Sequence, residues 1–571
     1  MEEKGADGAG VARDRVLWIA VVFALVMLAL GLTDAVESDE GVLTYLGAAM
    51  TADAPVATLF LQKMHPTLSV LYLPAVALGW RGFIAAHALL GALGVFAIGR
   101  WADKLGGDGW LAALTVALSP AYGFSVCTGQ SNSDGIALLA LGLWLYESDG
   151  ALRRFAAGVV LGLTVWARYE FGAFVSALGI IAILRPGRRA TALGMLAIPL
   201  LYLPAGAIYH RDLLWFFHHL PMEAEAAPGL GRVFGVTYNL RGLRRILTAV
   251  TLVSSAWPLV LTPAALSERG SARTVVVVGA ALLLAFTTSA LLGLYGPEVV
   301  PRYLSIVLPA VAFAASRARL LRAPRALPWV SAAAAILWFG ALLCFSAAGR
   351  FEPPTAMVAL SALALAGPAA VAWSRGPSRV RALALLTALS SLVVAASPAV
   401  AWRGMEPWHS RAREAEAVRR AAAVHRPAVI VTDIQSLTPV LHRAGLPSAR
   451  YLFSADVVAG LHSITNHRNG QYASASWGFH DHYEVGGGLW PCELARYDFR
   501  AGDLVVLGGE FRTRVLVPAS AWEADTELVA VVGTATIRRF VRGPVRVRLP
   551  PPPPWMTQRV FEAACAVRRP D

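Results

Sequence analysis

The chain has 571 residues, of which 56% are hydrophobic and only 15% are charged. This composition excludes a soluble protein of such length and is typical of a polytopic α-helical membrane protein, because long apolar runs recur over roughly the first 400 residues. The formal charge of +13 does not indicate a nucleic-acid partner, since the arginines fall mainly in short loops between apolar runs. The runs also lack the two-residue alternation of a membrane barrel.

The apolar runs predict about 13 membrane spans, the first of which we take as a retained helix rather than a signal peptide. They cover residues 16–33, 82–99, 109–126, 134–147, 155–167, 171–185, 190–209, 247–266, 273–295, 303–316, 328–347, 356–373 and 381–401.

The loops between the spans alternate between strongly basic and mixed or acidic. The positive-inside rule makes the basic set cytoplasmic and the N-terminus cytoplasmic as well. This assignment requires that residues 66–80 do not cross the membrane. We therefore expect residues 34–80 to form one large outside loop, with short helices at 39–50 and 66–79 lying on the membrane.

After residue 404, where the membrane domain (1–404) is expected to end, the pattern changes. The stretches AVIVTD, DLVVLGG, ELVAVVG and TIRRFVRG predict strands, and helical stretches flank the first of them. Residues 405–549 are therefore predicted to form an extracytoplasmic α/β domain, followed by a Pro-rich tail at 550–571.

Four carboxylates directly follow the first span: Asp34, Glu37, Asp39 and Glu40. Acidic side chains at that depth are costly unless hydrated or paired, so the cluster indicates a functional site. Further polar residues are expected on the same membrane face, namely Lys63, His65, Asp134, Arg168, Tyr169, Glu170, Arg302 and Tyr303. A transporter would place ionisable groups near the midplane, and the predicted spans show no such charges.

Transfer from a polyprenyl-phosphate donor fits such a face. The phosphate leaving group needs cations and no general acid, the acceptor hydroxyl needs one carboxylate as general base, and the prenyl chain needs a lateral groove open to lipid.

Five segments, in order, also resemble the GT-C class of integral-membrane glycosyltransferases, especially the protein O-mannosyltransferase and lipid A aminoarabinose transferase type. They are SDEGVLTYLGAAM, KMHPTLSVLYL, LTVALSPAYGFSVCTGQSNSDGIALLALGLWLYE, TVWARYEFGAF and PRYLSIVLPAV. The resemblance implies that Asp39 acts as or orients the base, with Glu40 in support. It also implies that His65 begins the family's HPP-type segment, here with Thr67 in place of the second proline, and that Lys63 faces the donor phosphate. The arginine often found after the acidic pair is absent, and Gly41 and Val42 stand there.

Each candidate also has a structural interpretation. Asp39 and Asp134 are good N-caps for the helices that follow them, Glu40 suits a first helical turn, and His65 can cap the helix begun by Pro66. Arg168 and Glu170 can pair with each other at the interface, Arg302 can snorkel, and Tyr169 and Tyr303 suit an aromatic belt.

Six further polar residues lie together in the C-terminal region: His462, His467, His480, Asp481, His482 and Glu484. Their spacing matches no closed structural metal site, so metal binding, acceptor recognition and an ordinary polar loop all stay open. Cys492 and Cys565 can form a disulfide if the C-terminal region lies in an oxidising compartment, and two unpaired thiols are the equal alternative. The sequence calls for no cofactor and no metal.

These patterns predict an inner-membrane GT-C-type glycosyltransferase of bacteria. It would move a sugar from a polyprenyl-phosphate carrier to an extracytoplasmic acceptor, with inversion at the anomeric carbon. The alternatives are a transporter or non-catalytic scaffold for lipid-linked substrates, and an oligosaccharide ligase or polymerase with the same donor chemistry.

Overall fold

A computed structural model describes much of the chain and divides it into two units. One unit comprises Met1–Gly31, His87–Tyr202 and Gly229–Met405, and the other comprises Leu32–Ala86, Leu203–Pro228 and Glu406–Asp571. The residues described are 4–32, 65–168, 171–210, 306–317, 413–432, 449–452, 488–489, 498–508, 523–533 and 535–546, with isolated positions at 41, 44, 45, 47, 48, 51, 55, 59, 60, 213, 277, 279, 437, 441 and 446.

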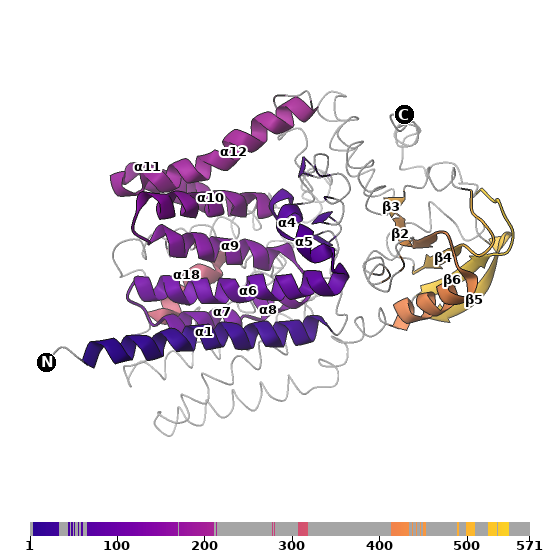
Figure 1. Ribbon diagram of the computed structural model, residues 1–571, viewed down its shortest axis with the longest axis horizontal. Coiled ribbons are helices and arrows are strands. Elements are labelled where there is room, and N and C mark those ends of the chain that lie inside the picture. Colours follow the sequence, from indigo (N-terminus) through magenta and orange to yellow (C-terminus); the bar gives the residue numbers. More distant parts are fainter. Residues whose placement is uncertain are drawn as a thin grey trace, which may run out of the picture. The chain divides into compact units, whose positions relative to one another are not determined.

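The first unit is a bundle of helices that lie side by side (Figure 1). Its helices are α1 (Lys4–Gly31), α6 (Gly79–Lys104), α7 (Gly109–Ala117), α8 (Pro120–Cys127), α9 (Ser131–Tyr146), α10 (Ala151–Ala167), α11 (Gly172–Leu184), α12 (Arg189–His210) and α18 (Leu308–Ser316). The first turns of α6 and the last turns of α12 belong to the second unit.

The apolar runs of this part of the chain form helices, as predicted. Among the described residues, Gly79–Lys104 and Pro186–Tyr209 are long and apolar enough to cross a membrane. The helices α7 and α8 make a third candidate if they count as one broken span. A helical protein with candidate membrane spans is thus confirmed. The expected spans 247–266, 328–347, 356–373 and 381–401 lie outside the described residues, as does nearly all of 273–295, and the total number of spans stays a prediction.

The span expected at 109–126 is not one continuous helix. It breaks between α7 and α8 with a bend of 63°. Pro120 stands at the start of α8, and a proline pushes the residue before it out of the helical region. Ser119 is accordingly extended, and its hydroxyl accepts a hydrogen bond from the Tyr122 amide at 3.3 Å, which caps α8.

The contacts between helices fix their directions. A Cβ atom added to Gly94 of α6 would lie 2.9 Å from the Cα of Ala137 in α9, and Lys104 donates to the Ser148 hydroxyl just beyond α9, so α6 and α9 run in the same direction. A Cβ on Gly99 would meet Val16 of α1 at 2.6 Å, whereas Phe23, further along α1, stacks on Tyr122, whose hydroxyl donates to the carbonyl of Gly91, so α1 runs opposite to α6. Consequently α1 ends and α6 begins at the same end of the bundle.

The segment predicted as a helix at 66–79 forms two short helices instead, α4 (Pro66–Leu71) and α5 (Leu73–Val76). Pro74 lies in the first turn of α5, and its lack of an N–H interrupts the helix around Tyr72. Even together, α4 and α5 fall well short of the roughly 20 residues that a membrane crossing needs. Tyr72 packs edge-on against Phe83 of α6, with ring centroids 5.0 Å apart.

The second unit contains a six-stranded sheet in the order β3-β2-β1-β4-β6-β5. The strands are β1 (Ile430–Thr432), β2 (Ala449–Leu452), β3 (Gly488–Leu489), β4 (Leu504–Leu507), β5 (Thr526–Val532) and β6 (Ala535–Phe540). The first four in this order are parallel, and β6 and β5 are antiparallel. Strands β1, β4, β5 and β6 fall in the four predicted stretches, whereas β2 and β3 had no strand pattern that we recognised.

A buried carboxylate anchors the beginning of β1 next to β4. Asp503 Oδ1 accepts the amides of Ala428 at 2.8 Å and Val429 at 3.0 Å, and Oδ2 accepts the amide of Arg500 at 2.8 Å.

The helix at 413–425 precedes β1 and carries exposed Glu416, whose pKa is lowered to about 2 by hydrogen bonds from Arg419 and Arg420. The limits 405–549 of an extracytoplasmic domain stay a prediction.

The closest approach between α10 and α12 gives a test of this packing. A Cβ atom on Gly158 would lie 2.0 Å from the Thr191 carbonyl oxygen and 2.8 Å from the Gly194 Cα, and both of these are backbone atoms. We expect Gly158→Ala to lower the free energy of unfolding by about 1–3 kcal/mol, because overpacking outweighs the better helix propensity of alanine. Thermal unfolding in detergent measures the effect.

Gly187→Ala is the matched control, since a Cβ there meets nothing within 4 Å. Equal melting temperatures for the two variants would contradict the close crossing of α10 and α12.

Candidate functional site

Buried polar side chains gather at one end of the helix bundle, which we call the polar end. Four of them, His87, Ser131, Asp134 and Arg168, form what we call the polar layer. Each is at most 3% exposed. They come from α6, the first turn of α9 and the residue that follows α10. Ionisable groups buried in an apolar bundle are costly and therefore mark a functional site by default.

The first pair in the layer joins α6 to α9. The Nε2 atom of His87 lies 2.9 Å from Oδ2 of Asp134. An ionised carboxylate can only accept a hydrogen bond, so with ionised Asp134 the imidazole donates from Nε2. The contact gives each side chain a hydrogen-bond partner where both are buried away from solvent.

The second pair joins the α10–α11 junction to the same turn of α9. Arg168 is extended after the last residue of α10, and its Nη1 donates to the Ser131 hydroxyl at 3.0 Å. Ser131 and Asp134 are three residues apart, which places them on one face of α9. The guanidinium and the carboxylate are therefore both held by one helical turn.

The turn between α8 and α9 is built from polar residues that bond to one another. Ser125 donates to the Gln130 side chain at 3.2 Å, and the Ser133 hydroxyl donates to the Gln130 carbonyl at 2.8 Å. Gly129 has a φ of 76°, a conformation that glycine adopts without strain. The run GQSNSD thus folds into a tight turn that delivers Ser131 and Asp134 to the bundle interior.

The opposite end of the bundle, the basic end, carries cations. Lys104 donates to the Ser148 hydroxyl at 2.6 Å, Arg188 lies 2.7 Å from the Glu147 carboxylate, and Arg154 donates to the Gly187 carbonyl at 2.7 Å. Arg317 donates to the Leu105 carbonyl. Four loops that the sequence groups as basic therefore meet at one end, away from the polar layer.

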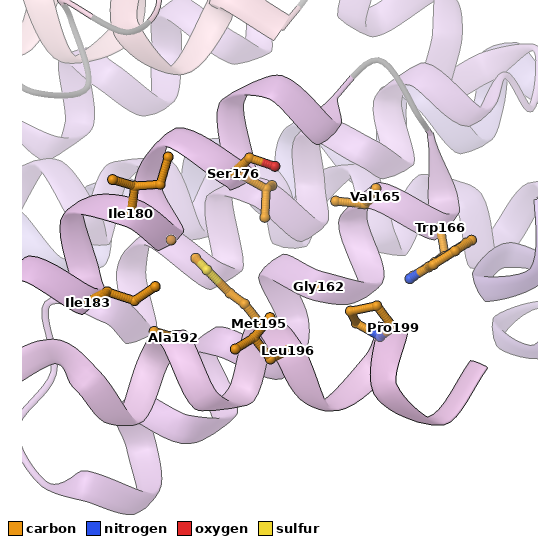
Figure 2. A pocket seen from close by; sticks show the side chains of 12 residues that line it. Gly162, Val165, Trp166, Ser176, Ile180, Ile183, Ala192, Met195, Leu196 and Pro199 are labelled. Carbon is orange, nitrogen blue, oxygen red and sulfur yellow. The ribbon is translucent and has the colours of Figure 1, made fainter. Parts of the chain in front are cut away.

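An apolar groove of about 320 Å³ opens between α10, α11 and α12 (Figure 2). It is lined by Gly162, Val165, Trp166, Val175, Ser176, Gly179, Ile180, Ile183, Ala192, Met195, Leu196 and Pro199. Ile180, Ile183 and Leu196 are each at least 47% exposed, so the groove is open on an apolar outer surface. Trp166 lines it two residues before Arg168, which brings the groove near the polar end. These properties suit a hydrocarbon chain.

The structure describes the positions of only some of the predicted site residues. Arg168 bonds to Ser131 in the first turn of α9, and Asp134 lies on that same turn, so both residues belong to the polar layer. His65 occupies the N-cap position of α4 in the left-handed region, with φ 51°, and its carbonyl accepts the amides of Leu68 and Ser69. Outside the described residues lie Asp39, Glu40, Lys63, Tyr169, Glu170, Arg302, Tyr303, the segment 462–484, Cys492 and Cys565.

Two expectations from the sequence are corrected. Asp134 is not an N-cap, because α9 begins at Ser131 after Gln130, and the carboxylate bonds to His87 instead. The expectation that the predicted spans contain no ionisable side chain is also wrong, because His87 lies inside α6 and is fully buried. Hydropathy hides a single histidine in an apolar run, so only its isolation between Ala86 and Ala88 could have drawn attention to it.

Known proteins resemble this chain in structure. A crystal structure of ArnT from Cupriavidus metallidurans bound to undecaprenyl phosphate superposes with a TM-score of 0.55, and one of the same protein in the apo state with 0.53. Each match covers 91% of this chain and 97% of the other, at 15% sequence identity. No protein-family model and no curated protein sequence matches.

This likeness extends over nearly the full length of both chains. ArnT is the lipid A aminoarabinose transferase, a GT-C enzyme. The resemblance to the GT-C class, seen first in five sequence segments, is thereby confirmed at the level of the fold.

The separation of the two ends of the bundle gives a test of orientation. Asp149 lies in the basic loop after α9 and is fully exposed, and Leu78 lies just before α6 and is 77% exposed. In a background without the four native cysteines, we expect a cysteine at Leu78 to react with a membrane-impermeant maleimide on intact spheroplasts. A cysteine at Asp149 should react only after permeabilisation, because basic loops stay in the cytoplasm. The reverse labelling pattern would overturn the orientation.

Proposed function

We propose that the protein is a glycosyltransferase of the bacterial inner membrane that moves a sugar from a polyprenyl-phosphate carrier to an extracytoplasmic acceptor. One observation carries the proposal: a buried cation bonded to the first turn of α9 and a buried carboxylate on that same turn lie at one end of an apolar bundle, whose fold resembles that of a protein solved with undecaprenyl phosphate. A phosphate leaving group needs such a cation, and its prenyl chain needs apolar helices.

The roles of the residues follow from the chemistry of transfer. Asp39 takes the proton of the acceptor hydroxyl, and Glu40 supports it. The acceptor oxygen then forms a bond to the anomeric carbon while the bond to the phosphate oxygen breaks, with inversion. The carrier leaves as a phosphate anion and needs no general acid, so cations suffice to stabilise it.

The cations and their neighbours come from several segments. Arg168 and His65 are the described members of the pool that contacts the donor phosphate, and Lys63 and Arg302 complete it. Asp134, Tyr169, Glu170 and Tyr303 belong to the same substrate-binding group. A guanidinium suits this task because it stays charged even when buried and donates along two parallel directions.

The location of the site favours chemistry on one side of the membrane. The polar end is the end where α1 finishes and α6 begins, and therefore the end to which the loop 34–80 is attached. Positive-inside reasoning makes this end extracytoplasmic, and the soluble part at 405–549 would then select or shape the acceptor there.

The base assignment is tested by Asp39→Asn. We expect turnover to fall by at least about 100-fold, since general-base catalysis contributes roughly that much or more, while affinity for undecaprenyl phosphate stays within about twofold. Turnover is followed by mass spectrometry of lipid-linked sugars, which should accumulate in a deletion strain and stay high when Asp39→Asn is supplied.

This experiment also separates a transferase from a transporter or scaffold. A protein that only moves or holds lipid-linked substrates loses nothing when a catalytic base becomes an amide. Normal turnover in Asp39→Asn would therefore remove Asp39 as the base.

The groove gives a second test of the donor class. Gly179→Leu would fill it, because a Cβ there comes 3.2 Å from the flexible Met195 sulfur and the longer side chain extends into the space. We expect affinity for undecaprenyl phosphate to fall roughly tenfold, since each CH2 removed from apolar surroundings costs about 0.8 kcal/mol. Farnesyl phosphate, with a shorter chain, should be affected less.

Leu184→Phe is the control, because it adds bulk to the exposed surface of α11 outside the groove. If Gly179→Leu weakens both lipids equally, or neither, the groove does not hold the prenyl chain.

A further inference from the structure

The pair formed by His87 and Asp134 does more than join two helices. Its side chains are 0% and 1% exposed, and they lie 2.9 Å apart. An interhelical hydrogen bond inside a membrane protein adds little stability, whereas a buried polar group that loses its partner is clearly destabilising. Two apolar side chains at these positions would not carry the cost of a buried polar group without a partner.

Close packing already holds α6 against its neighbours without the pair. A Cβ atom on Gly91, one turn after His87, would come 2.6 Å from the side chain of Val126 in α8. At Gly94 it would come 2.9 Å from the Cα of Ala137 in α9. The Tyr122 hydroxyl donates to the Gly91 carbonyl at 2.7 Å. These contacts fix the distance between helices, so the ionisable pair is not needed for that purpose.

The pair instead acts on the turn of α9 that carries the rest of the polar layer. Asp134 and Ser131 share a face of α9, and Ser131 accepts the hydrogen bond from Arg168. A shift of the Asp134 side chain or of this first turn would therefore move the partner of the guanidinium. His87 contacts Asp134 of that turn from α6, a helix that close packing against α8 and α9 holds in place.

We propose that His87 is a positioning residue: its ring holds the Asp134 carboxylate and, through the first turn of α9, fixes Ser131 and the Arg168 guanidinium toward the phosphate of a lipid-linked donor. This inference rests on the proposed function for the identity of the phosphate. The positioning itself rests on the geometry of α6 and α9 alone.

The test compares His87→Ala with His87→Gln in the full-length protein. The glutamine amide nitrogen can replace Nε2 as a donor to Asp134, whereas alanine cannot. We expect His87→Ala to speed hydrogen exchange in the peptides covering 131–137 and 164–168 at least threefold and to weaken binding of undecaprenyl phosphate about tenfold. His87→Gln should restore both to within about threefold of the wild type.

A control removes another buried hydrogen bond far from the layer. The Thr115 hydroxyl donates to the Leu111 carbonyl in α7, and Thr115 is 3% exposed. Thr115→Val should leave lipid affinity and the exchange of both peptides unchanged even where its melting temperature falls. A loss of affinity in Thr115→Val equal to that in His87→Ala would reduce the role of His87 to general stability.

The two measurements separate the inference from the function on which it rests. If wild-type protein does not bind undecaprenyl phosphate, the proposed function fails, and the exchange rates alone decide whether His87 positions the layer. If the protein binds the lipid but His87→Ala changes neither exchange nor affinity, His87 is not a positioning residue. Faster exchange with unchanged affinity would also overturn the proposal, because the layer would then be separate from the donor.

Discussion

The burial of charged and polar groups at one end of an apolar bundle is the constraint that organises the described helices. His87, Ser131, Asp134 and Arg168 lose almost all contact with solvent, so each must meet a partner at hydrogen-bonding distance. Those partners come from three places in the chain, which forces α6, α9 and the α10–α11 junction into one relative position. Glycines make this possible, because the backbone of α6 reaches α9 only where Gly94 has no side chain.

The two ends of the bundle use charge in different ways. At the basic end, Arg154 is partly exposed and its partner Asp149 is fully exposed, and an ion pair at such a surface contributes at most about 1 kcal/mol. Such residues tie loops together but add little stability, and the positive-inside rule predicts that they set the orientation in the membrane. At the polar end the same kinds of groups are buried, and their cost is tolerated only because their geometry is needed.

The sequence predicts the helices well because hydrophobic length is a local property. The runs at 155–167, 171–185 and 190–209 correspond to α10, α11 and α12 within a few residues. The break before Pro120 was a local signal too, but apolar content on both sides concealed it. The C-terminal strands β2 and β3 are short, and they are strands because β2 pairs with β1 and β3 pairs with β2, not because of a pattern of their own.

The site is less accessible to sequence reasoning because it depends on register between helices. Asp134 and Arg168 stand out as polar residues next to apolar runs, and both enter the polar layer. The run GQSNSD offers several equally good capping residues, so nothing local shows that Gln130 precedes the helix and Asp134 turns inward. The partnership of His87 with Asp134 depends on two helices 47 positions apart in sequence running in the same direction.

The depth of the layer bears on the choice between transfer and transport. With a rise of about 1.5 Å per residue, Asp134 lies roughly 5 Å and His87 roughly 12 Å from the start of its helix, in a bundle that would span a core of about 30 Å. Alternating access needs binding groups near the midplane, often at helix breaks whose backbone is open to the substrate. The break at Ser119 is closed by its own hydroxyl, which caps α8. Asp134 and Arg168 thus lie close to one end of the bundle rather than at its midplane, which favours transfer, with carrier phosphate and acceptor on the same face of the membrane, over alternating access.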